Sequence, residues 1–359
     1  MKINILTQPL LSNYGGILQN YALQEILRRF GHEPLTLNKS KLPPSGRVVW
    51  KDIIHILLNY VSKIRGNYNL PFLSPYTMAV KDHELSFPQA RFIKKYINKK
   101  DAKFPLDKSI ISDYPAEAWI VGSDQVWRPW CSPEISNFFF DFTENFPVKR
   151  IAYAASFGTD QWEIDEKTTK EIKPLAKRFD YISVREASGV YLLKQYLDVE
   201  SVHLLDPTLL LKADDYLNLC DKKDFPQAPY IAAYVLDLDV KKKKILKKES
   251  EAACLPVESI GEMRKEGYDS IERWLATFAG SEKVITDSFH GTVFSLIFRK
   301  PVKVITNDVR GNARLQSLIE SIELKNDSEG YYTLDRNAEK LLNDLREKSL
   351  AFLKDALGK

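Results

Sequence analysis

The stretch KVITDSFHGTVFSLIF, residues 283–298, joins two different hydrophobic patterns. Its first part is a β-branched run that is typical of a buried strand, and its last part is an apolar run that indicates a helix. The polar turn Asp-Ser-Phe-His-Gly lies between them, so His290 stands where a strand passes into a helix. A strand that leads directly into a helix is the unit from which parallel, helix-covered sheets are built. The stretch therefore predicts an α/β fold with an imidazole at the edge of a sheet.

The same alternation of strand and helix runs through most of the chain. The first predicted helix, 17–30, has Arg28 and Arg29 in its last turn and Gly31 just beyond, which is a typical helix end. Runs rich in Ile, Val and Tyr, bounded by turn residues, predict the strands. The predicted strands are 3–7, 33–38, 118–124, 150–158, 181–186, 201–207, 230–237, 255–261, 283–289 and 301–307, and the further helices include 165–178, 187–197, 270–280 and 336–356. Such alternation implies parallel sheets covered by helices on both faces.

A polar stretch, LKADDYLNLCDKKDFPQAP at 211–229, interrupts the alternation before it restarts. A chain of 359 residues is too long for one ordinary core and suggests two domains. We place the domain boundary at this stretch, which gives an N-terminal domain of residues 1–212 and a C-terminal domain of residues 213–359. Two doubly wound parallel sheets that face each other across a cleft are the simplest architecture. The final helical stretch, 336–356, can pack back across the boundary.

Composition narrows the class of protein. Hydrophobic residues make up 44% of the chain, which is ordinary for a globular protein, and no apolar run approaches the roughly 20 residues that span a bilayer. The start, MKINILTQPL, reads as a first strand rather than a signal sequence. The three cysteines are scattered, which favours a reducing cytosol. The net charge of +4 is spread among mixed charges, so we expect no nucleic-acid partner.

Four polar turns follow predicted strands, at the edge where open parallel sheets bind ligands. In the first, SNYGGILQNYALQ at 12–24, Gly15 and Gly16 open a helix and can bring backbone N–H groups close to a phosphate or carboxylate. The turn is not a G-x-G-x-x-G motif, so a dinucleotide site is weakly supported. A tight turn that serves only helix–sheet packing is an equally good interpretation.

The second and third turns present other polar groups. VGSDQVW, at 121–127, offers the hydroxyl, carboxylate and amide of Ser123, Asp124 and Gln125, a set that suits a sugar, although an N-capped turn explains it as well. SVREASG, at 183–189, places Arg185 after a buried strand, where a guanidinium can bind a carboxylate or phosphate in bidentate fashion. The alternative for Arg185 is a structural ion pair, with Glu186 as its neighbour.

The fourth turn is the one in the opening stretch. Asp287 and Ser288 occupy helix-cap positions, and His290 lies in the first helical turn. An isolated histidine at such a place most often only caps or packs. A helix N-terminus disfavours imidazolium, however, so a histidine there can act as a general base, or as an acid once an anionic ligand is bound.

Six motifs in this order resemble the polysaccharide pyruvyl transferase family: NYGGILQNYALQ, VGSDQVW, YAASFG, SVRE, LLDPTLLL and TDSFHGTVFSLIF followed by KP. The resemblance spans about residues 3–320. It implies a glycosyltransferase B-like fold of two Rossmann-like domains facing a cleft. It also implies transfer of a ketal pyruvyl group from phosphoenolpyruvate to two hydroxyls of one sugar. Bacterial members modify capsular polysaccharide, exopolysaccharide or cell-wall glycans.

The resemblance assigns residues as well. The family's catalytic histidine falls on His290, and its phosphoenolpyruvate-binding arginine falls on Arg185. Many members carry Arg-Leu immediately before that histidine, where this chain has Ser288 and Phe289. One expected cation is therefore missing from its usual place. Arg310 or Arg314, after the next strand, can replace it.

The chemistry implied by the resemblance needs one residue that moves protons, and His290 suits it because imidazole titrates near neutral pH. Asp124 or Asp287 can deprotonate the sugar hydroxyl or orient the histidine. We expect Gly15, Gly16 and Ser288 to contact the donor. The acceptor sugar would be held by Asn13, Tyr14, Ser123 and Gln125. We expect neither a metal nor a cofactor, with phosphoenolpyruvate as the donor substrate.

Two further segments bear on location. The stretch VVWKDIIHILLNYVSKIRG, 48–66, has apolar residues at helical spacing and reads as a core or interdomain helix. The alternative is an interfacial helix that brings a cytoplasmic enzyme to the inner face of the membrane, where an acceptor linked to undecaprenyl diphosphate would lie. KKKKILKK, at 241–248, is most simply the solvated face of a helix, and a contact with anionic lipid is the alternative.

Two other functions stay open from the sequence. A nucleotide-sugar glycosyltransferase of the same fold would place a carboxylate on a ribose, and Glu258 and Glu262 are candidates for it. A two-lobed, non-catalytic sugar- or anion-binding protein is the third class. The sequence does not identify the acceptor sugar, which of its hydroxyls are bridged, or the stereochemistry of the ketal. It does not identify the oligomeric state either.

Overall fold

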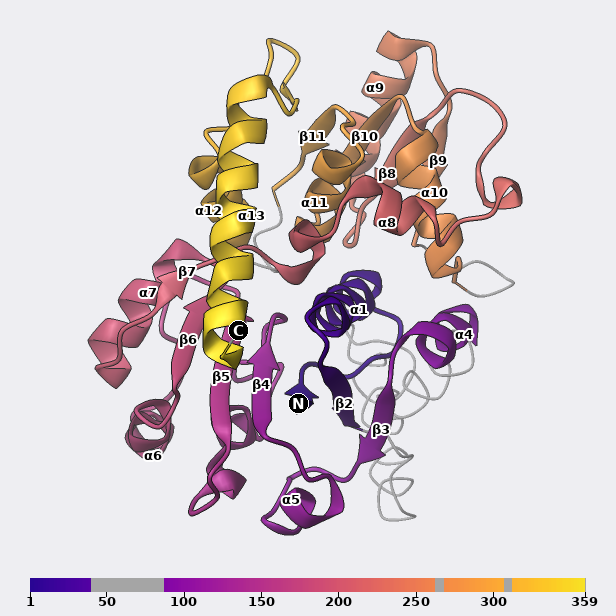
Figure 1. The fold of residues 1–359 in the computed structure, drawn as a ribbon. Helices are drawn as coiled ribbons and strands as arrows, with labels where there is room; N and C mark the ends of the chain where they lie inside the picture. Colours follow the sequence, from indigo (N-terminus) through magenta and orange to yellow (C-terminus); the bar gives the residue numbers. More distant parts are fainter. Residues whose placement is uncertain (40–86, 262–267, 307–311, 359) are drawn as a thin grey trace, which may run out of the picture.

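Two β-sheets organise the chain, one in each half of the sequence (Figure 1). The computed structural model describes residues 1–39, 87–261, 268–306 and 312–358. The helix expected at 48–66 lies outside these residues, as do Arg310 and Glu262.

The first sheet has seven parallel strands in the order β3-β2-β1-β4-β5-β6-β7. Its strands are β1 (Lys2–Leu6), β2 (Glu33–Lys39), β3 (Lys99–Ala102), β4 (Ala118–Gly122), β5 (Lys149–Ala155), β6 (Tyr181–Val184) and β7 (Val202–His203). The strand order reverses between β1 and β4, where Ile5 pairs with Ile120. Loops that leave neighbouring strands in opposite directions open a crevice at such a point.

The second sheet has the order β12-β11-β10-β8-β9. Its strands are β8 (Ile231–Tyr234), β9 (Val257–Ser259), β10 (Lys283–Thr286), β11 (Val302–Val304) and β12 (Tyr331–Tyr332). They are parallel except for β12, an antiparallel edge strand that the sequence analysis missed. β3 was missed as well, because a short, polar edge strand such as KKDA lacks the apolar pattern of a buried one.

Helices connect the strands. They are α1 (Tyr14–Arg29), α4 (Phe87–Tyr96), α5 (Ser109–Asp113), α6 (Glu166–Ala176), α7 (Ala187–Leu192), α8 (Ala213–Leu217), α9 (Val240–Ala253), α10 (Ile271–Gly280), α11 (Phe289–Ile297), α12 (Ala313–Ser321) and α13 (Arg336–Leu357). A π-helical turn, η3 (Leu193–Leu197), and four 3-10 turns, η1 (Ile135–Phe139), η2 (Asp141–Thr143), η4 (Pro207–Leu210) and η5 (Lys222–Asp224), complete the set.

Local sequence explains the ends of α1. The side chain of Asn13 accepts a hydrogen bond from the Gly16 N–H and caps the first turn. At the other end Gly31 adopts the left-handed conformation, with φ of 76°, and the N–H of His32 returns to the Leu27 carbonyl. α1 begins at Tyr14, three residues before the predicted start at residue 17, because its cap, Asn13, precedes Gly15 and Gly16.

The two halves share one hydrophobic core. The largest cluster of buried side chains contains strands and helices from both sheets. Tyr14, on α1, stacks on Trp274, on α10, with ring centroids 5.5 Å apart. Tyr216, on α8, packs edge-on against Phe294, on α11. α1 lies between the two sheets in Figure 1, so packing fixes the position of one half relative to the other.

The final helix, α13, returns to the first sheet after the second is complete, as Figure 1 shows for the yellow helix. The Ser349 hydroxyl accepts the Leu205 N–H at 3.1 Å, and the Lys149 ammonium donates to the Ala356 carbonyl at 3.1 Å. The Phe352 ring packs against Tyr153. Glu339 of the same helix pairs with Arg299, so residues of α13 contact elements on both sides of the boundary placed at residue 212.

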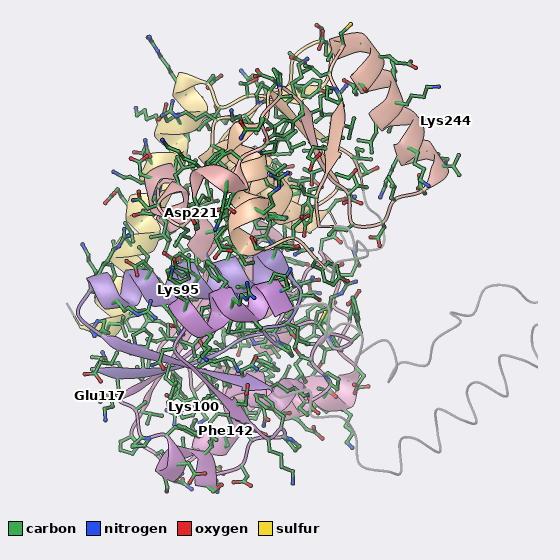
Figure 2. All side chains as sticks on the ribbon, turned by 90° about the vertical axis from the view of Figure 1, so that its right-hand side faces the viewer. Lys95, Lys100, Glu117, Phe142, Asp221 and Lys244 are labelled. Atoms are coloured by element: carbon green, nitrogen blue, oxygen red, sulfur yellow. The ribbon has the colours of Figure 1, made fainter. Side chains whose placement is uncertain are left out.

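α9 carries the lysine run and lies at the far end of the molecule from the first sheet, where Lys244 is labelled in Figure 2. Most lysines of the run are exposed, as expected for a solvated helix face, but Lys242 is buried. Among the described residues no helix is both long and apolar enough to cross a bilayer.

Leu353→Ala tests the structural role of α13. The Leu353 side chain is fully buried in the shared core, so the substitution should lower the free energy of unfolding by about 3 kcal/mol. Urea unfolding followed by tryptophan fluorescence and by circular dichroism should give one coincident transition, because the core is common to both halves. The exposed Lys348→Ala on the same helix is the control. Unchanged stability of Leu353→Ala, or two separated transitions, would contradict the shared core.

Candidate active site

A polar cavity of about 350 Å³ lies between the start of α1, the end of β4 and the starts of α11 and α12. These elements come from both halves of the chain. The lining residues are Ser12, Asn13, Tyr14, Asp124, Gln125, Tyr234, Leu236, Gly261, Tyr268, Asp287, Ser288, Phe289, His290, Asn312, Arg314 and Leu315.

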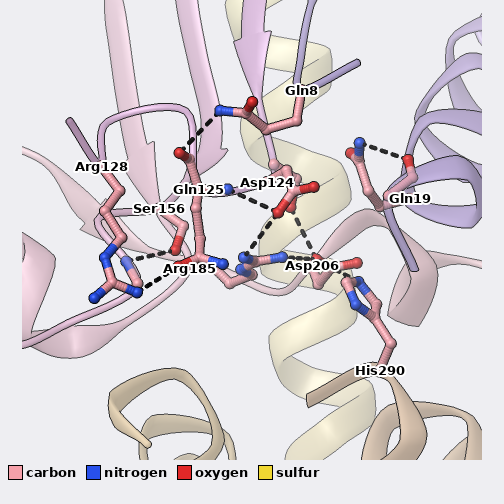
Figure 3. Close-up of polar contacts among 12 residues, drawn as sticks. Gln8, Gln19, Asp124, Gln125, Arg128, Ser156, Arg185, Asp206 and His290 are labelled. Atoms are coloured by element: carbon pink, nitrogen blue, oxygen red, sulfur yellow. Dashed lines mark hydrogen bonds and ion pairs between the residues drawn. The ribbon is translucent and has the colours of Figure 1, made fainter. Parts of the chain in front are cut away.

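Asp206 is the centre of the polar network behind this cavity (Figure 3). Its Oδ2 atom accepts hydrogen bonds from Arg185 Nη1 at 2.7 Å and from the Ser123 hydroxyl at 2.9 Å. The same oxygen lies 3.6 Å from His290 Nε2. Its Oδ1 atom accepts the backbone N–H and the hydroxyl of Thr208. One carboxylate therefore joins three polar side chains that lie far apart in the sequence.

The Asp206 carboxylate is fully buried. Burial alone would raise its pKa, but the His290 ring, the Arg185 charge and the Thr208 hydroxyl outweigh burial and hold the pKa well below the usual range. A depressed pKa means that the carboxylate stabilises the fold fully above the ordinary value of about 3.9, and that this contribution is lost as the pH falls.

His290 lies in the first turn of α11, as predicted, and Ser288 caps that helix by accepting the Gly291 N–H. The His290 ring is buried except for one edge, which lines the cavity. Gly15 packs directly against the ring, since a Cβ atom built on it would lie 2.0 Å from His290 Nδ1. Only glycine fits there, because the neighbour of Gly15 is the imidazole.

Arg185 is buried more deeply than the sequence analysis expected. Its side chain is 1% exposed and does not line the cavity. The guanidinium binds Asp206, lies 4.0 Å from an Asp124 carboxylate oxygen, and sits behind the Phe289 ring with its Cζ atom 4.9 Å from the ring centroid. Its Nε and Nη2 atoms have no hydrogen-bond partner within the part of the chain that the structure describes. The expectation that Arg185 faces the cleft directly is therefore wrong in this conformation, because Asp206 draws the guanidinium inward.

Arg314 is the guanidinium that does line the cavity. Its Cζ atom lies 5.8 Å from the centroid of the Phe289 ring, so one aromatic side chain contacts two guanidinium groups. Burial, and then the like charge of Arg185, lower the pKa of Arg314 to about 10. Of the two arginines considered as replacements for the cation absent at Ser288, Arg314 lies at the cavity, and Arg310 is outside the described residues.

Glu186, the neighbour of Arg185, is a buried acid of this region. Its Oε1 atom accepts the backbone N–H groups of Phe157 and Gly158. Burial raises its pKa, in spite of the opposing charges of Arg185 and Arg314. The expected alternative, an Arg185–Glu186 ion pair at the domain edge, is replaced by the pair between Arg185 and Asp206.

The turn after β4 is only partly at the cavity. Asp124 and Gln125 line it, and Asp124 also accepts the Gln125 N–H. Ser123 is fully buried and donates its hydroxyl to Asp206, so the structure places it away from the cavity rather than on an acceptor sugar. Gln125 accepts a hydrogen bond from Arg128 at 3.2 Å, which fixes the amide at the cavity wall.

The residues before α1 lie on the opposite wall. Asn13 lines the cavity while its side chain caps α1 and lies 3.5 Å from Asp124. Tyr14 also lines the cavity, and its hydroxyl donates to the Asp269 carbonyl at 2.7 Å. Burial, and then the nearby Asp269, raise the pKa of Tyr14 well above its ordinary value, so the phenol stays protonated. Gly16 gives its N–H to the Asn13 cap.

Asp287 lines the cavity, and its carboxylate is held by contacts away from His290. Its carboxylate accepts the Leu236 N–H at 2.7 Å and the Asp237 N–H at 3.3 Å, and it pairs with the buried Lys242 ammonium at 2.7 Å. These contacts direct the carboxylate toward the loop after β8. The carboxylate that contacts His290 belongs to Asp206 instead, so Asp287 is not the residue that orients the imidazole.

Glu258, the described candidate for a ribose-binding carboxylate, pairs with Arg273 at 3.2 Å and does not line the cavity. Among the residues that the structure describes, no group of three or more His, Cys, Asp or Glu side chains is arranged as metal ligands.

Asp206 was missed as a site residue, although it stands in the motif LLDPTLLL. An aspartate before proline reads locally as a helix cap, and Asp206 does cap the turn η4. No local sequence pattern predicts the contacts of Oδ2, the carboxylate oxygen that binds Arg185 and Ser123. An acidic residue inside a fully apolar stretch was the available clue, because buried carboxylates need partners.

Asp287→Ala separates a structural role from a catalytic one. The variant leaves the Lys242 ammonium buried without its carboxylate, so the free energy of unfolding should fall by about 3 to 5 kcal/mol, measured by urea denaturation. Lys243→Ala, on the exposed face of α9, should change stability by less than about 0.5 kcal/mol. A stable but inactive Asp287→Ala would return Asp287 to the chemistry.

Comparisons with known proteins agree with this architecture. A family model described as polysaccharide pyruvyl transferase matches residues 13–309, which is most of the chain. No curated protein sequence matches.

Solved structures of the glycosyltransferase B type share the fold. A putative UDP-N-acetylglucosamine 2-epimerase from Listeria monocytogenes is 10% identical with a TM-score of 0.50, over 99% of this chain and 89% of that chain. S. aureus MnaA, solved with UDP, is 10% identical with a TM-score of 0.49, over 99% and 91%. The spinosyn rhamnosyltransferase SpnG is 11% identical with a TM-score of 0.39, over 100% and 92%. At such identities the likeness concerns the fold of two Rossmann-like units, which is the predicted one.

Proposed function

The chain belongs to the polysaccharide pyruvyl transferase family, and from this premise we propose that it moves a pyruvyl group from phosphoenolpyruvate to two hydroxyls of one sugar. The product is a cyclic pyruvate ketal, and phosphate is released. The acceptor is a polysaccharide or its lipid-linked precursor, and the enzyme works in the cytoplasm, at the inner face of the membrane where such precursors are built. It is a transferase of polysaccharide pyruvylation.

The position of His290 and the Arg314 guanidinium at one cavity, with Arg185 buried behind it, supports this function most directly. His290 and Arg185 meet at the same Asp206 oxygen, and Arg314 reaches the cavity beside them. Phosphoenolpyruvate carries a carboxylate and a phosphate group with about two charges at neutral pH. A site for it has to be cationic and rich in N–H donors.

The donor would lie between Arg314 and the first turn of α11. Arg314 supplies the guanidinium that faces the cavity, and the free N–H groups at the start of α11 favour an anion. Ser288 lines the cavity beside them. Arg185 adds positive charge from behind Phe289, and its two unpaired N–H groups become available to the donor if the ring moves.

The reaction is an addition to the double bond of an enol phosphate. A proton is added to the methylene carbon, and a sugar hydroxyl attacks the central carbon, which gains oxocarbenium character. The C–O bond to phosphate breaks, the second hydroxyl closes the ketal, and its proton leaves with phosphate. His290 carries the proton that moves between the hydroxyl and the methylene carbon. Asp124 lines the cavity wall and would accept a proton from the acceptor.

The acceptor sugar would occupy the side of the cavity formed by Asn13, Tyr14 and Gln125. All three present side chains that are already fixed by other contacts: Asn13 caps α1, Tyr14 stacks on Trp274 and Gln125 is held by Arg128. Because these side chains are already fixed, they can hold two hydroxyls of one sugar near the central carbon of phosphoenolpyruvate. Little further side-chain entropy is lost when the sugar binds.

His290→Ala should lower the release of phosphate from phosphoenolpyruvate by at least about 100-fold, because the proton carrier is lost. The assay uses a panel of lipid-linked and model glycosides as acceptors, with circular dichroism to confirm folding. His32→Gln is the matched control, since His32 immediately precedes β2, at the amino end of that strand, and does not line the cavity. Near-normal turnover by a folded His290→Ala enzyme would remove His290 from the mechanism.

Arg314→Gln should raise the KM for phosphoenolpyruvate by about 10- to 100-fold, the value of one charge-assisted contact, with a smaller change in KM for the acceptor. Arg128→Gln is the control, because Arg128 is a neighbouring arginine that binds Glu163 and does not line the cavity. If Arg314→Gln leaves the donor KM unchanged, the cation that binds the donor is another one.

A thermal-shift comparison distinguishes the pyruvyl transferase from the two other functions. Phosphoenolpyruvate should raise the melting temperature, since a ligand that binds only the folded state stabilises it. Stabilisation by nucleoside diphosphates alone would favour a nucleotide-sugar glycosyltransferase, and stabilisation by free sugars alone a binding protein.

A further inference from the structure

The second sheet carries a helix, α9, whose exposed face is almost entirely cationic. α9 lies at the outer end of the molecule in Figure 2, where Lys244 is labelled. Only one exposed acidic residue, Glu251, lies on the helix, and it is 3.7 Å from Lys247. No other carboxylate of the described residues is within ion-pair distance of the exposed lysines. These lysines, which we call the lysine face, are Lys241, Lys243, Lys244, Lys247 and Lys248.

The lysine face destabilises the helix that carries it. The first turn of α9 contains lysines and no acidic residue, although the N-terminus of a helix disfavours positive charge. Two pairs of exposed lysines, 243 with 247 and 244 with 248, are four positions apart, where like charges on a helix repel each other. The arrangement therefore costs free energy in water.

Another exposed helix of the same chain shows the arrangement that solvation alone favours. On α6, Lys170 lies 2.6 Å from Glu166, and Lys167 lies 4.0 Å from Glu171, both at a spacing of four residues. Such pairs stabilise a helix and keep its face soluble. Because α9 has one such pair and otherwise unopposed lysines, its charge pattern indicates a partner that supplies negative charge from outside.

The first turn of α9 is fixed to the proposed active site. Leu236, in the loop between β8 and α9, lines the cavity, and so does Asp287. The Asp287 carboxylate accepts the Leu236 N–H at 2.7 Å and binds the Lys242 ammonium at 2.7 Å. Lys242 also donates to the Asp237 carbonyl at 2.9 Å. One buried lysine thus joins the cavity wall to the start of the helix, while its neighbours on either side point to solvent.

The chemistry of the lysine face fits a lipid surface. A row of lysines on a convex helix can meet many headgroup phosphates of an anionic bilayer at once, and each lysine near such a surface adds to the attraction. Val240, the first residue of α9, is 70% exposed beside the lysines. An apolar side chain at the edge of a basic helix is typical of a contact with the interfacial region of a bilayer.

We propose that the lysine face of α9, with Val240 at its start, docks the protein on an anionic lipid bilayer and so holds the cavity near the membrane surface. The purpose of this docking rests on the proposed function, because an acceptor built on a lipid carrier lies at that surface. The contact is electrostatic and peripheral, so it is reversible and weakens with salt.

Vesicle flotation with the full-length protein tests the docking. At low ionic strength the protein should bind vesicles of equal parts phosphatidylglycerol and phosphatidylcholine, and not vesicles of phosphatidylcholine alone. Added salt should release it. The double variant Lys241→Glu with Lys244→Glu should lower the partition coefficient by at least about 10-fold. Its melting temperature should stay the same or rise, because acidic residues near the start of a helix and beside lysines are stabilising.

Lys167→Glu with Lys170→Glu, on α6, is the matched control. It changes the net charge by the same amount on a helix of the first sheet, so vesicle binding should stay within about twofold. Circular dichroism confirms the folding of each variant. An equal loss of binding in both double variants would mean that net charge decides, and no loss in the α9 variant would mean that another surface binds. Either result overturns the proposal, as does a wild-type protein that binds both kinds of vesicle equally or neither.

A soluble anion distinguishes a bilayer from an isolated phosphate site. Free glycerol phosphate, at the phosphate concentration of the vesicles and at constant ionic strength, should not displace the protein from them. Displacement would indicate a site for a single anion and would overturn docking on a surface. Vesicle binding is measured without substrates, so failure of phosphoenolpyruvate turnover would reject the proposed function and leave this result intact.

Discussion

The structure depends on one buried carboxylate and the groups that neutralise it. Asp206 lies in the connection that leads out of the first sheet, and it binds Arg185 and Ser123 from that sheet while it faces His290 from the second half. A charge that is fully removed from water is costly unless it is paired and hydrogen-bonded, and removal of one partner leaves the others unsatisfied. The carboxylate therefore constrains the relative positions of β4, β6 and α11. The contacts of Asp206 therefore contribute both to the stability of the fold and to the geometry of the site.

Apolar packing gives that contact a rigid frame. The ring of Tyr14 stacks on Trp274 across the two halves, and α13 returns to cover the first sheet, with the Ser349 hydroxyl bonded to the backbone just before Asp206. A shared core of this kind resists independent movement of the halves, because separating them would expose apolar surface to water. It explains why Gly15 can stand against an imidazole from the other half with no room for a methyl group.

Two acidic residues near α11, Asp287 and Asp206, make different contacts. Asp287 stands three residues before His290 and binds Lys242 and the loop after β8, so it holds the second sheet together. Asp206 is remote in sequence and serves the imidazole. The cations are redistributed in a similar way. Ser288 provides a helix cap where a cation was expected, and Arg314 reaches the Phe289 ring and the cavity from α12.

The sequence by itself determined the alternation of strands and helices, the cap at Ser288 and the place of His290 in the first turn of α11. These features are local, since hydrophobic period, caps and turn residues act over a few positions. Tertiary structure alone decided which carboxylate meets His290, that Arg185 is drawn inward behind Phe289, that Ser123 faces the interior and not a sugar, and that β3 and β12 complete the sheets. Pairing of buried charges and closure of sheet edges depend on elements that packing brings together from distant parts of the chain. No local pattern encodes such contacts, because their free energy comes from burial that exists only once both halves are folded.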